Sequence, residues 1–430
     1  MATDTEYVLV TEYFHPDTAS TGQLMTDLAV GLTERGLDVT VYTGQPNYHS
    51  GENQRQPTVT THEGVTVRRI RAPQLRQSSL AKRLINWLVF TGWMFVVLLF
   101  DSTDQRREVI FVSNPPFLPP ALWVVCHIRG WEYTAIVYDL YPDAAVELGH
   151  VGRQGVLHRM WEWLTVRTLR HANHVVSLGP AMKRRICAKG AIDPEKVRII
   201  HNWEDESFIV PRSKEENWFS QEHDLVDRFT ILYSGNIAEF HDLETLVRAA
   251  AEMDEREVQV MIIGEGDAKR DIVEIAEATD VRGSTVSFLP YQPLEDLPYS
   301  LTAGDVSVVA VEEGFEGVQV SCKLYSALAS GQPVLVIAQP HDDEAQIVDG
   351  FDAGISVEQG DVKGVLDAVE YWRSNPDAVR RQGEHARDAF ENHFVKEQSV
   401  DAYYSMLTED MPPGSERDTV SPGVRVSFTT

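Results

Sequence analysis

Residues 320–335 read Val-Ser-Cys-Lys-Leu-Tyr-Ser-Ala-Leu-Ala-Ser-Gly-Gln-Pro-Val-Leu. This stretch predicts a helix of small residues that begins near Lys323, then a Gly-Gln-Pro turn, then an apolar strand. A helix start presents unpaired backbone N–H groups with a partial positive charge, and Lys323 adds a full charge. Such an arrangement suits a phosphate-bearing ligand. An ordinary strand–helix–strand unit with a surface lysine has the same spacing, so the neighbouring segments must decide between the two interpretations.

Apolar runs and helical patterns alternate along the chain on both sides of this stretch. The predicted strands of the first half are Tyr7–Val10, Val39–Tyr42, Val65–Ile70, Val109–Val112, Tyr133–Tyr138, His174–Leu178 and Val197–Ile200. Those of the second half are Phe229–Ser234, Val258–Ile263, Val286–Leu289, Val306–Val309, Val334–Ile337 and Gly354–Val357. The helical patterns between them are Gly22–Arg35, Gly155–Arg170, Ala181–Ala188, Leu243–Met253, Ala268–Ala278, Lys323–Ser330 and Val362–Arg373. This order predicts two tandem doubly wound, Rossmann-like α/β domains.

The predicted domain boundaries follow changes in composition. We expect an N-terminal α/β domain over residues 1–204, a polar linker over 205–228 and a C-terminal α/β domain over 229–375. Closing helices are predicted over 376–408 and a disordered tail over 409–430. Parallel sheets bind ligands at the carboxyl ends of their strands, so we expect the site in a cleft between the two domains.

The charge of the chain is strongly acidic but unevenly distributed. Its net charge is −27; residues 1–200 carry 21 Lys+Arg and 19 Asp+Glu, and the remaining residues carry 17 and 46. The acidic half argues against a nucleic-acid partner. An acidic, lysine-poor surface is typical of proteins from a salt-rich cytoplasm, which we take as its explanation. The nearly neutral first half suggests a face that meets something anionic or apolar.

Cysteine usage and the N-terminus predict a cytoplasmic protein. The three cysteines, Cys126, Cys187 and Cys322, are far apart and lack metal-ligand spacing, which is typical of a reducing compartment. The chain passes directly into the strand at Tyr7, so we expect no signal peptide.

The segment Leu84–Phe100 has no charged residue and carries the large aromatic side chains Trp87, Phe90, Trp93 and Phe95. Basic residues precede it and acidic residues follow it, and its 17 residues are marginal for crossing a bilayer. Crossing would also separate the next strand from its sheet. We therefore expect a helix on the membrane surface, about residues 84–100, with its basic flank at the lipid headgroups, although a core helix remains an open alternative.

Three loops of the first domain carry candidate residues. Ser20, Thr21 and Gly22 follow the first strand and allow backbone amides to approach a phosphate, unless Ser20 or Thr21 simply caps the helix. Asp139 ends the fifth predicted strand and is the candidate for a hydrogen-bonding or base role at a sugar hydroxyl. Asn114 follows another strand end and would line the same cleft, while Asp143 either joins it or caps a helix.

The second domain adds two glycine-rich turns. Gly235 and Asn236 follow its first strand, and Gly264, Glu265 and Gly266 follow its second. Glycine at a strand end permits a tight turn or the close approach of a ligand, and together with Lys323 these turns predict one binding site.

Further candidates in this domain are Ser321 and Leu324 beside the lysine, and Glu344, which would accept from ribose or sugar hydroxyls or stand at an acidic helix start. No His, Cys or Asp/Glu cluster has metal-ligand spacing, so we expect neither a metal nor another cofactor.

Together these segments resemble family 4 glycosyltransferases of the GT-B fold. The likeness rests on Tyr-Ser-Gly-Asn at 233–236, on the lysine helix at 320–335 and on Asp-Leu-Tyr-Pro-Asp at 139–143, and it is greatest to the colanic-acid-biosynthesis type. It runs from about residue 6 to about residue 405.

The resemblance implies a metal-independent, configuration-retaining enzyme whose nucleotide sugar is held mainly by the C-terminal domain. It implies that Gly235 and Asn236 flank the donor diphosphate, that Lys323 neutralises it, and that Gly264–Gly266 lies near the nucleoside. It also implies that Ser20–Gly22 faces the cleft, that Asp139 lies near the transferred sugar or the acceptor, and that the closing segment Asn375–Leu407 crosses back onto the first domain.

The chain departs from the family pattern at several positions. Many members carry two glutamates eight positions apart, where this chain has Val318 and Ser326. A basic pair usually follows the glycine-rich strand, where this chain has Glu239, His241 and Asp242. These departures make Lys323 the principal candidate cation and leave the sugar-binding carboxylate unassigned.

The leading hypothesis is a retaining glycosyltransferase that acts on a membrane-borne, lipid-linked glycan acceptor in glycoprotein or surface-polysaccharide assembly, peripheral to the inner face of the cell membrane. Retention needs a stabilised diphosphate leaving group and an acceptor on the same face of the sugar. Two alternatives remain, a nucleotide-sugar epimerase on the same fold and a non-catalytic partner protein.

Overall fold

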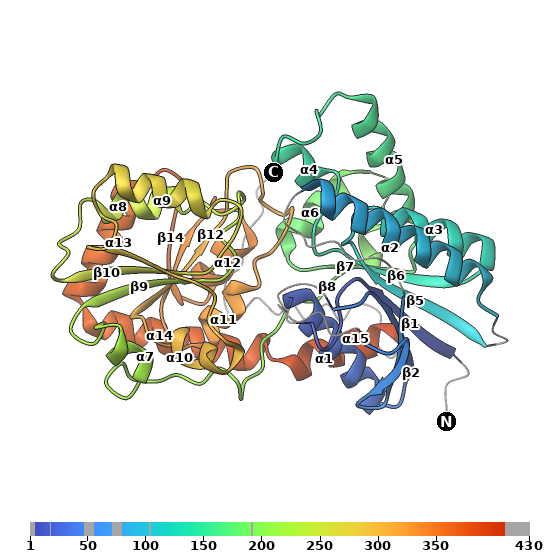
Figure 1. Cartoon of the computed structure of the whole chain (residues 1–430), viewed down its shortest axis with the longest axis horizontal. Helices are drawn as coiled ribbons and strands as arrows, with labels where there is room; N and C mark the ends of the chain where they lie inside the picture. The colour runs from blue at the N-terminus through green and yellow to red at the C-terminus, as the bar shows by residue number, and fades with distance from the viewer. Residues whose placement is uncertain are drawn as a thin grey trace. The chain divides into compact units, whose positions relative to one another are not determined.

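The computed structural model describes residues 5–17, 19–46, 56–70, 80–102, 105–190 and 192–408 (Figure 1). The predicted tail, 409–430, lies outside them. The chain forms two compact units, each with its own sheet. Of the described residues, the first unit contains those up to 201 together with 317–320 and 399–408, and the second contains 202–316 and 321–398.

The first unit is built on an eight-stranded sheet in the order β3-β4-β2-β1-β5-β6-β7-β8. Its neighbouring strands are parallel except for the antiparallel pair β3 and β4. The strands are β1 (Thr5–Thr11), β2 (Asp38–Thr43), β3 (Val59–His62), β4 (Val65–Arg69), β5 (Arg106–Val112), β6 (Glu132–Ile136), β7 (His174–Ser177) and β8 (Val197–Ile199). The helices of its first two hundred residues are α1 (Ser20–Glu34), α2 (Leu80–Phe100), α3 (Leu118–Arg129), α4 (Asp143–Glu147), α5 (Val156–His171), α6 (Pro180–Ala188) and the 3₁₀ turn η1 (Pro194–Lys196).

The second unit has six parallel strands in the order β11-β10-β9-β12-β13-β14. They are β9 (Phe229–Ser234), β10 (Val258–Ile263), β11 (Val286–Leu289), β12 (Val306–Ala310), β13 (Val334–Ile337) and β14 (Gly354–Val357). The helices are α7 (Trp218–Glu222), α8 (Glu244–Ala250), α9 (Lys269–Ala278), η2 (Leu294–Asp296), α10 (Leu297–Ser300), α11 (Lys323–Ala329), α12 (Asp343–Gly350), α13 (Val362–Ser374) and α14 (Pro376–His393). The central strands are apolar on both faces because helices cover both sides of such a sheet.

The predicted strands are present in both sheets, and the elements of the first unit that the sequence missed include β3 and α3. Strand β3 alternates half-buried and exposed residues at the sheet edge, so it lacks the apolar run of a central strand. Helix α3 has prolines at its first turn and a largely apolar sequence, which hides the helical period.

The segment predicted as a linker, 205–228, is instead part of the second unit. It contains α7, whose Phe219 is buried with Leu225 in a small apolar cluster beside β9 and β10. Asn217 caps α7 and donates from its side-chain amide to the carbonyl of Tyr299 at 2.8 Å. Because segment 205–228 is mostly polar, its sequence does not indicate that Phe219, Leu225 and Asn217 anchor it to the second unit.

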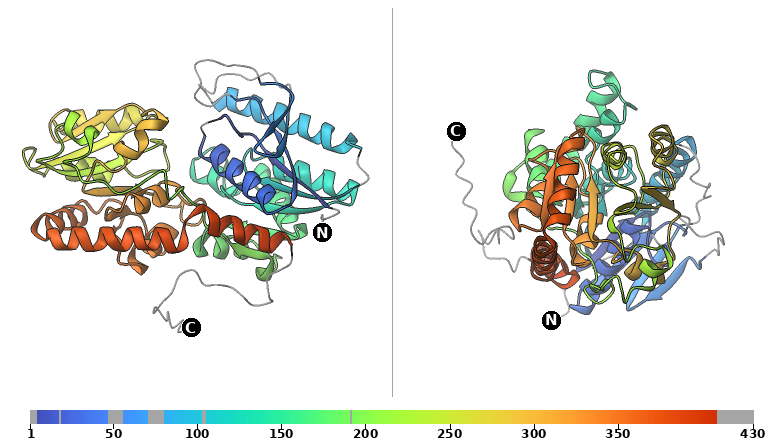
Figure 2. Two further views of the ribbon diagram at one scale, coloured as in Figure 1. Left: turned by 90° about the horizontal axis from the view of Figure 1, so that it is seen from below. Right: turned by 90° about the vertical axis from the view of Figure 1, so that its left-hand side faces the viewer.

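The two closing helices belong to different units. They are coloured orange-red and red in Figure 2. Helix α14 belongs to the second unit, and most of α15 (Lys396–Leu407) belongs to the first. Within the first unit, Tyr7 Oη donates to the carbonyl of Leu407 at 3.3 Å, and Ser399 Oγ donates to the carbonyl of His201 at 3.0 Å. The last helix therefore completes the domain that the N-terminus begins.

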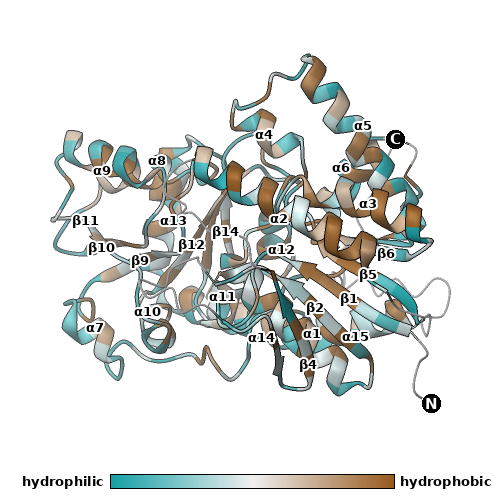
Figure 3. Cartoon of the chain, turned by 45° about the vertical axis from the view of Figure 1, so that its right-hand side comes forward, coloured by the Kyte–Doolittle hydropathy of each residue, from teal (hydrophilic) through white to brown (hydrophobic). Residues whose placement is uncertain are grey.

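Helix α2 lies against α3 and is buried along one side only. Asn86, Phe90, Met94 and Leu98 lie on its buried face, and its exposed large apolar side chains are Ile85, Leu88, Trp93, Val96 and Phe100. Figure 3 shows that α2 is largely hydrophobic. By length and composition alone, Ala81–Phe100 is long and apolar enough to cross a membrane. The strands before and after it, β4 and β5, belong to one sheet, which argues against crossing.

Candidate functional site

Three glycines lie in the turns that follow β9 and β10. A side chain at any of them would displace neighbouring atoms. A Cβ at Gly264 would lie 1.9 Å from the carbonyl oxygen of Gly235, and a Cβ at Gly266 would lie 2.1 Å from that of Ile237. All three glycines have positive φ angles, +138° at Gly235, +144° at Gly264 and +159° at Gly266. The two turns lie against each other because β9 and β10 are parallel neighbours.

Lys323 extends along the first of these turns. A Cβ at Gly235 would lie 2.5 Å from Cε of Lys323, so the lysine stem occupies the space that the glycine leaves. The lysine Nζ lies 5.5 Å from the ring centre of Tyr233 and 3.2 Å from Nε2 of His241. The structure thus brings together the lysine and the glycine turns that the sequence singled out.

The imidazole of His241 is held in one orientation. The backbone N–H of Ala238 lies 3.3 Å from its Nδ1, and Tyr233 Oη lies 3.1 Å from the same atom. Burial, followed by the charge of Lys323, holds the pKa of His241 well below its usual range, so the ring is neutral.

The contact between His241 and Lys323 is compatible with both charge states of the lysine. An ammonium donates to Nε2 when the ring proton is on Nδ1, and a neutral amine accepts from Nε2–H. Burial lowers the pKa of Lys323 to about 8 against the opposing effects of Cys322 and Glu344. When no anion is bound, Lys323 therefore loses its proton near pH 8.

The start of α11 does not offer the free amides that the sequence suggested at two positions. The Ser321 N–H donates to Oε1 of Glu344 at 2.6 Å, and the Leu324 N–H donates to the carbonyl of Ser321 at 3.1 Å. Helix α11 has only seven residues, and its amides serve the turn that starts it. These two amides are therefore already engaged, the positive charge here comes from the lysine side chain, and the donor-binding role of Ser321 and Leu324 stays a prediction.

Glu344 lies next to the lysine as a buried carboxyl group. Its side chain is fully buried at the start of α12, and Oε2 has no hydrogen-bond partner. Burial raises the pKa of Glu344 well above its usual range, and the neighbouring Asp342 adds to the rise. Burial therefore favours the protonated form of Glu344, which can donate as well as accept.

The other donor-side candidates have partners in the same turns. Tyr233 Oη donates to the carbonyl of Asn236 at 2.6 Å, and the Asn236 side chain lies beside Gly266. Glu265 accepts from Lys269 Nζ at 2.7 Å. These contacts fix the backbone of both turns.

In the first unit, β1, β5 and β6 are adjacent, so the loops at their carboxyl ends are neighbours. Asp139 follows β6, and its backbone N–H donates to Ser113 Oγ, after β5, at 2.9 Å. Burial raises the pKa of Asp139 to about 6. Asn114 follows β5, and its buried Oδ1 has no partner. The structure therefore places Asp139 and Asn114 at one edge of the sheet, as the sequence predicted.

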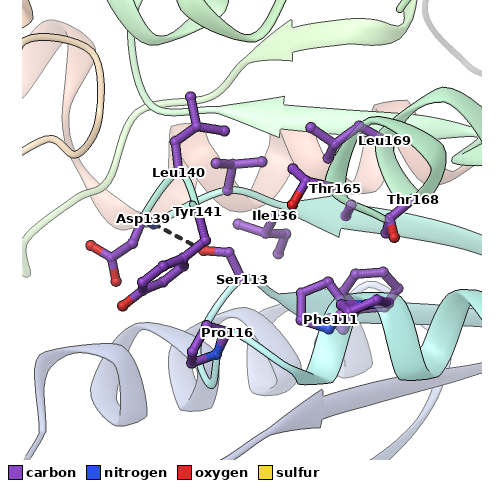
Figure 4. Close-up of a pocket in the computed structure, with 14 residues that line it drawn as sticks. Phe111, Ser113, Pro116, Ile136, Asp139, Leu140, Tyr141, Thr165, Thr168 and Leu169 are labelled. Atoms are coloured by element: carbon purple, nitrogen blue, oxygen red, sulfur yellow. Dashed lines mark hydrogen bonds between the residues drawn. The ribbon is translucent and has the colours of Figure 1, made fainter. Parts of the chain in front are cut away.

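A small apolar pocket lies beside Asp139 (Figure 4). Its volume is about 30 Å³, room for roughly two water molecules, so in this form it does not admit a sugar ring. The ring of Tyr141, which also lines the pocket, stacks on Trp161 of α5 with centroids 5.7 Å apart.

Two other predictions for the first unit differ from the structure. Helix α1 starts at Ser20 with Ala19 as its N-cap and no side-chain cap, so neither Ser20 nor Thr21 is the cap. Gly22 is buried, and a Cβ there would lie 3.1 Å from that of Tyr13, so this glycine serves packing against the preceding loop.

Asp143 is the second difference, because it belongs to an ion-pair network. It pairs with Arg185 Nε at 3.0 Å and with the ammonium of Lys189, which also contacts Glu162 at 2.9 Å. Three elements, α4, α5 and α6, are held together by these pairs. Asp143 therefore has a structural role as an ion-pair partner, and the motif Asp-Leu-Tyr-Pro-Asp does not reveal these partners.

Sequence reasoning missed three groups near these sites. The sequence does not reveal that His241 contacts Lys323, because the two residues are 82 positions apart. Glu12 follows β1 as a buried carboxyl whose pKa burial raises to about 8. Glu204 accepts from Ser326 Oγ at 2.7 Å, so a distant carboxylate reaches the helix position at which the family pattern has a glutamate.

Among the residues described by the structure, no group of three His, Cys, Asp or Glu side chains is arranged to hold a metal ion.

Comparisons with known proteins agree with this fold. A glycosyl transferase 4-like domain matches residues 21–203, and a glycosyl transferases group 1 domain matches residues 228–375. The chain belongs to the glycosyltransferases of the GT-B fold.

Among its relatives, the putative colanic acid biosynthesis glycosyl transferase WcaI of Escherichia coli is 25% identical over 352 residues, 80% of this chain and 86% of that protein. The sucrose-phosphate synthase of Thermosynechococcus elongatus has a similar structure, with a TM-score of 0.73 at 17% identity over 95% of this chain and all of that chain. HepE of Anabaena, solved with UDP, has a TM-score of 0.69 at 13% identity over 94% of this chain and all of that chain.

Proposed function

We propose that this glycosyltransferase transfers a sugar, with retention of configuration, from a nucleoside diphosphate sugar to a lipid-linked glycan acceptor at a membrane surface. The observation that carries the donor part is the meeting of Gly235, Gly264 and Lys323 at the carboxyl ends of two adjacent parallel strands. The absence of side chains at the glycines lets a diphosphate approach the backbone, and the lysine supplies its counter-charge. The UDP complex of HepE supports the same ligand class.

The chemistry proposed for the second unit is stabilisation of the leaving group. Negative charge grows on the diphosphate as the glycosidic bond to it breaks, and Lys323 in its ammonium form offsets that charge. The protonated Glu344 is proposed to hydrogen-bond a hydroxyl of the nucleoside or sugar. Because these groups supply the charge, we propose that no metal ion is needed.

The acceptor part rests on the first unit. Asp139, with its pKa near 6, is the candidate to accept a hydrogen bond from the acceptor or the transferred sugar, and Asn114 offers an unpartnered oxygen at the same sheet edge. The exposed apolar face of α2 supports a location on the inner face of the cell membrane. The relationship to WcaI supports a place in polysaccharide assembly.

Donor use is tested by incubating the protein with UDP-, GDP- and dTDP-sugars, in dilute buffer and in molar salt to include the proposed salt adaptation. We expect one nucleoside diphosphate to be released in excess over the enzyme, and proton NMR to show a product with the anomeric configuration of the donor. An inverted product would contradict retention, and interconversion of donor sugars without release would indicate an epimerase. Failure of every nucleotide sugar to bind would contradict an enzymatic role.

The affinity for the nucleoside diphosphate is expected to fall as the pH rises above about 8. The free lysine loses its proton near pH 8, and an anionic ligand favours the ammonium form, so binding takes up a proton from solution. Above this pH the affinity should decline by up to tenfold per pH unit. Isothermal titration calorimetry at pH 8, in buffers of different ionisation enthalpy, measures the proton uptake directly.

Two variants separate Lys323 from the other groups that face it, His241, Tyr233, Cys322 and Glu344. In Lys323→Arg the guanidinium stays charged, so proton uptake near pH 8 should disappear. In Cys322→Ser the uptake should persist, because the thiol is not its source. Equal proton uptake in wild type and Lys323→Arg would assign the effect to another group.

A further inference from the structure

Helix α5 presents an apolar face to solvent at its N-terminal end. Val156 is 84% exposed, and Leu157, Met160 and Trp163 are each more than half exposed. Leu157, Met160 and Trp163 follow Val156 by one, four and seven positions, which places all four on one side of the helix. Large apolar side chains gathered in this way on a surface indicate an interaction site.

The same helix is basic in an acidic protein. It carries Arg159, Arg167 and Arg170, all exposed, and a single acidic residue, Glu162, which is paired with Lys189. The chain as a whole has a net charge of −27. The guanidinium of Arg167 lies 5.3 Å from the ring centre of Trp163, so arginine and apolar groups share one surface.

Helix α5 is connected to α2 through α3, since α3 packs against both. Ile128 of α3 is also exposed, and α2 adds Leu88 and Phe100 on its open side. Helix α2 has Lys82 and Arg83 in its first turn and no acidic residue. Exposed apolar residues are therefore present on three helices of one unit, and each of these helices also carries basic residues.

We propose that the exposed face of α5 inserts into the surface of a membrane that contains anionic lipids, with its arginines at the headgroups, as a second contact beside α2. This inference rests on the proposed membrane location. It adds helix α5 as a second membrane contact and anionic lipids as the preferred lipid class. An amphipathic helix with large apolar residues on one face and arginines beside them is suited to the interface of a bilayer. The basic charge of α5 complements anionic headgroups, whereas the rest of this acidic protein is repelled by them.

Flotation of the full-length protein with vesicles tests the inference. Vesicles of phosphatidylcholine alone are compared with vesicles that also contain phosphatidylglycerol. We expect wild type to float with the anionic vesicles, and Val156→Glu with Leu157→Glu to reduce the bound fraction at least fivefold. The matched control is Leu294→Glu, an exposed leucine in the second unit, which should leave flotation unchanged.

The arginines are tested separately. Arg159→Gln with Arg170→Gln should weaken binding to anionic vesicles and reduce its salt dependence, with little effect on neutral vesicles. Arg270→Gln, an exposed arginine of α9, is the control. Equal flotation of the arginine variant and wild type on anionic vesicles would overturn the proposed lipid selectivity.

Three results distinguish failure of this inference from failure of the proposed function. If the α5 variants float like wild type while Ile85→Glu with Leu88→Glu does not, α2 alone binds membrane and the inference is overturned. If wild type does not float but sedimentation shows a dimer that Val156→Glu with Leu157→Glu dissociates, a second copy covers this face and the inference is overturned. Binding of soluble nucleoside diphosphate is measured for wild type and for every variant. If wild type does not bind it, the proposed function is contradicted instead. Thermal melting confirms that each variant is folded.

Discussion

Replacing Lys323 by alanine is expected to lower the affinity for the nucleoside diphosphate by roughly 10- to 100-fold, the range for a hydrogen bond to a charged group. The expected loss in kcat/KM is larger, roughly 100- to 1,000-fold, because charge on the diphosphate increases as the sugar leaves. In the described structure the amides of Ser321 and Leu324 already have acceptors, so they do not replace the lysine. Calorimetric titration and initial rates measure the two effects.

The matched control for this variant is Lys363→Ala. Lys363 lies on α13 of the same unit, exposed, and pairs with Asp367 one turn away. We expect its removal to change neither binding nor rate. If Lys323→Ala binds the diphosphate as wild type does, the lysine has no donor role and the site assignment is wrong.

Replacing Gly264 by alanine is expected to destabilise the second unit by more than about 4 kcal/mol. The new methyl group would lie 1.9 Å from the carbonyl oxygen of Gly235, and the φ of +144° is one that residues with a side chain rarely adopt. The ends of β9 and β10 would have to separate, which disrupts the backbone around the lysine. Thermal melting should show a drop of roughly 10 °C or more, and diphosphate binding should be lost.

Gly283→Ala provides the comparison for Gly264→Ala. Gly283 also has a positive φ, +79°, but a Cβ added there would have no other atom within 4 Å. Its substitution therefore carries only the conformational cost, about 1–2 kcal/mol. Equal destabilisation by the two substitutions would show that the contact between the turns is not what requires glycine at 264.

The sequence predicted how the glycine turns and the lysine come together because its signals are local. Glycines directly after apolar strands, such as Gly235 and Gly264, and a lysine at a helix start each occupy positions that chain order alone assigns to one sheet edge. The position of Asp139 at a strand end was found for the same reason. These predictions needed only the alternation of strands and helices.

The predictions that failed depended on contacts between distant segments. The linker interpretation of 205–228 overlooked Asn217, whose partner Tyr299 is 82 positions away. The ion pairs of Asp143 and the contact between His241 and Lys323 also join segments far apart in sequence. The exposure of Val156 was also hidden, because periodicity defines an apolar face but not whether anything covers it.

The route of the last helix determines when each half of the protein can fold during synthesis. Residues 202–398 contain the whole sheet of the second unit, whereas the first unit lacks α15 until the chain has been made as far as residue 407. The contacts of Tyr7 with Leu407 and of Arg35 with Asp401 join residues that are 400 and 366 positions apart, so the first of each pair is synthesised long before its partner. The first unit is therefore begun first and completed last. Until Val400 has been synthesised, its buried methyl groups do not cover Gly31 of α1.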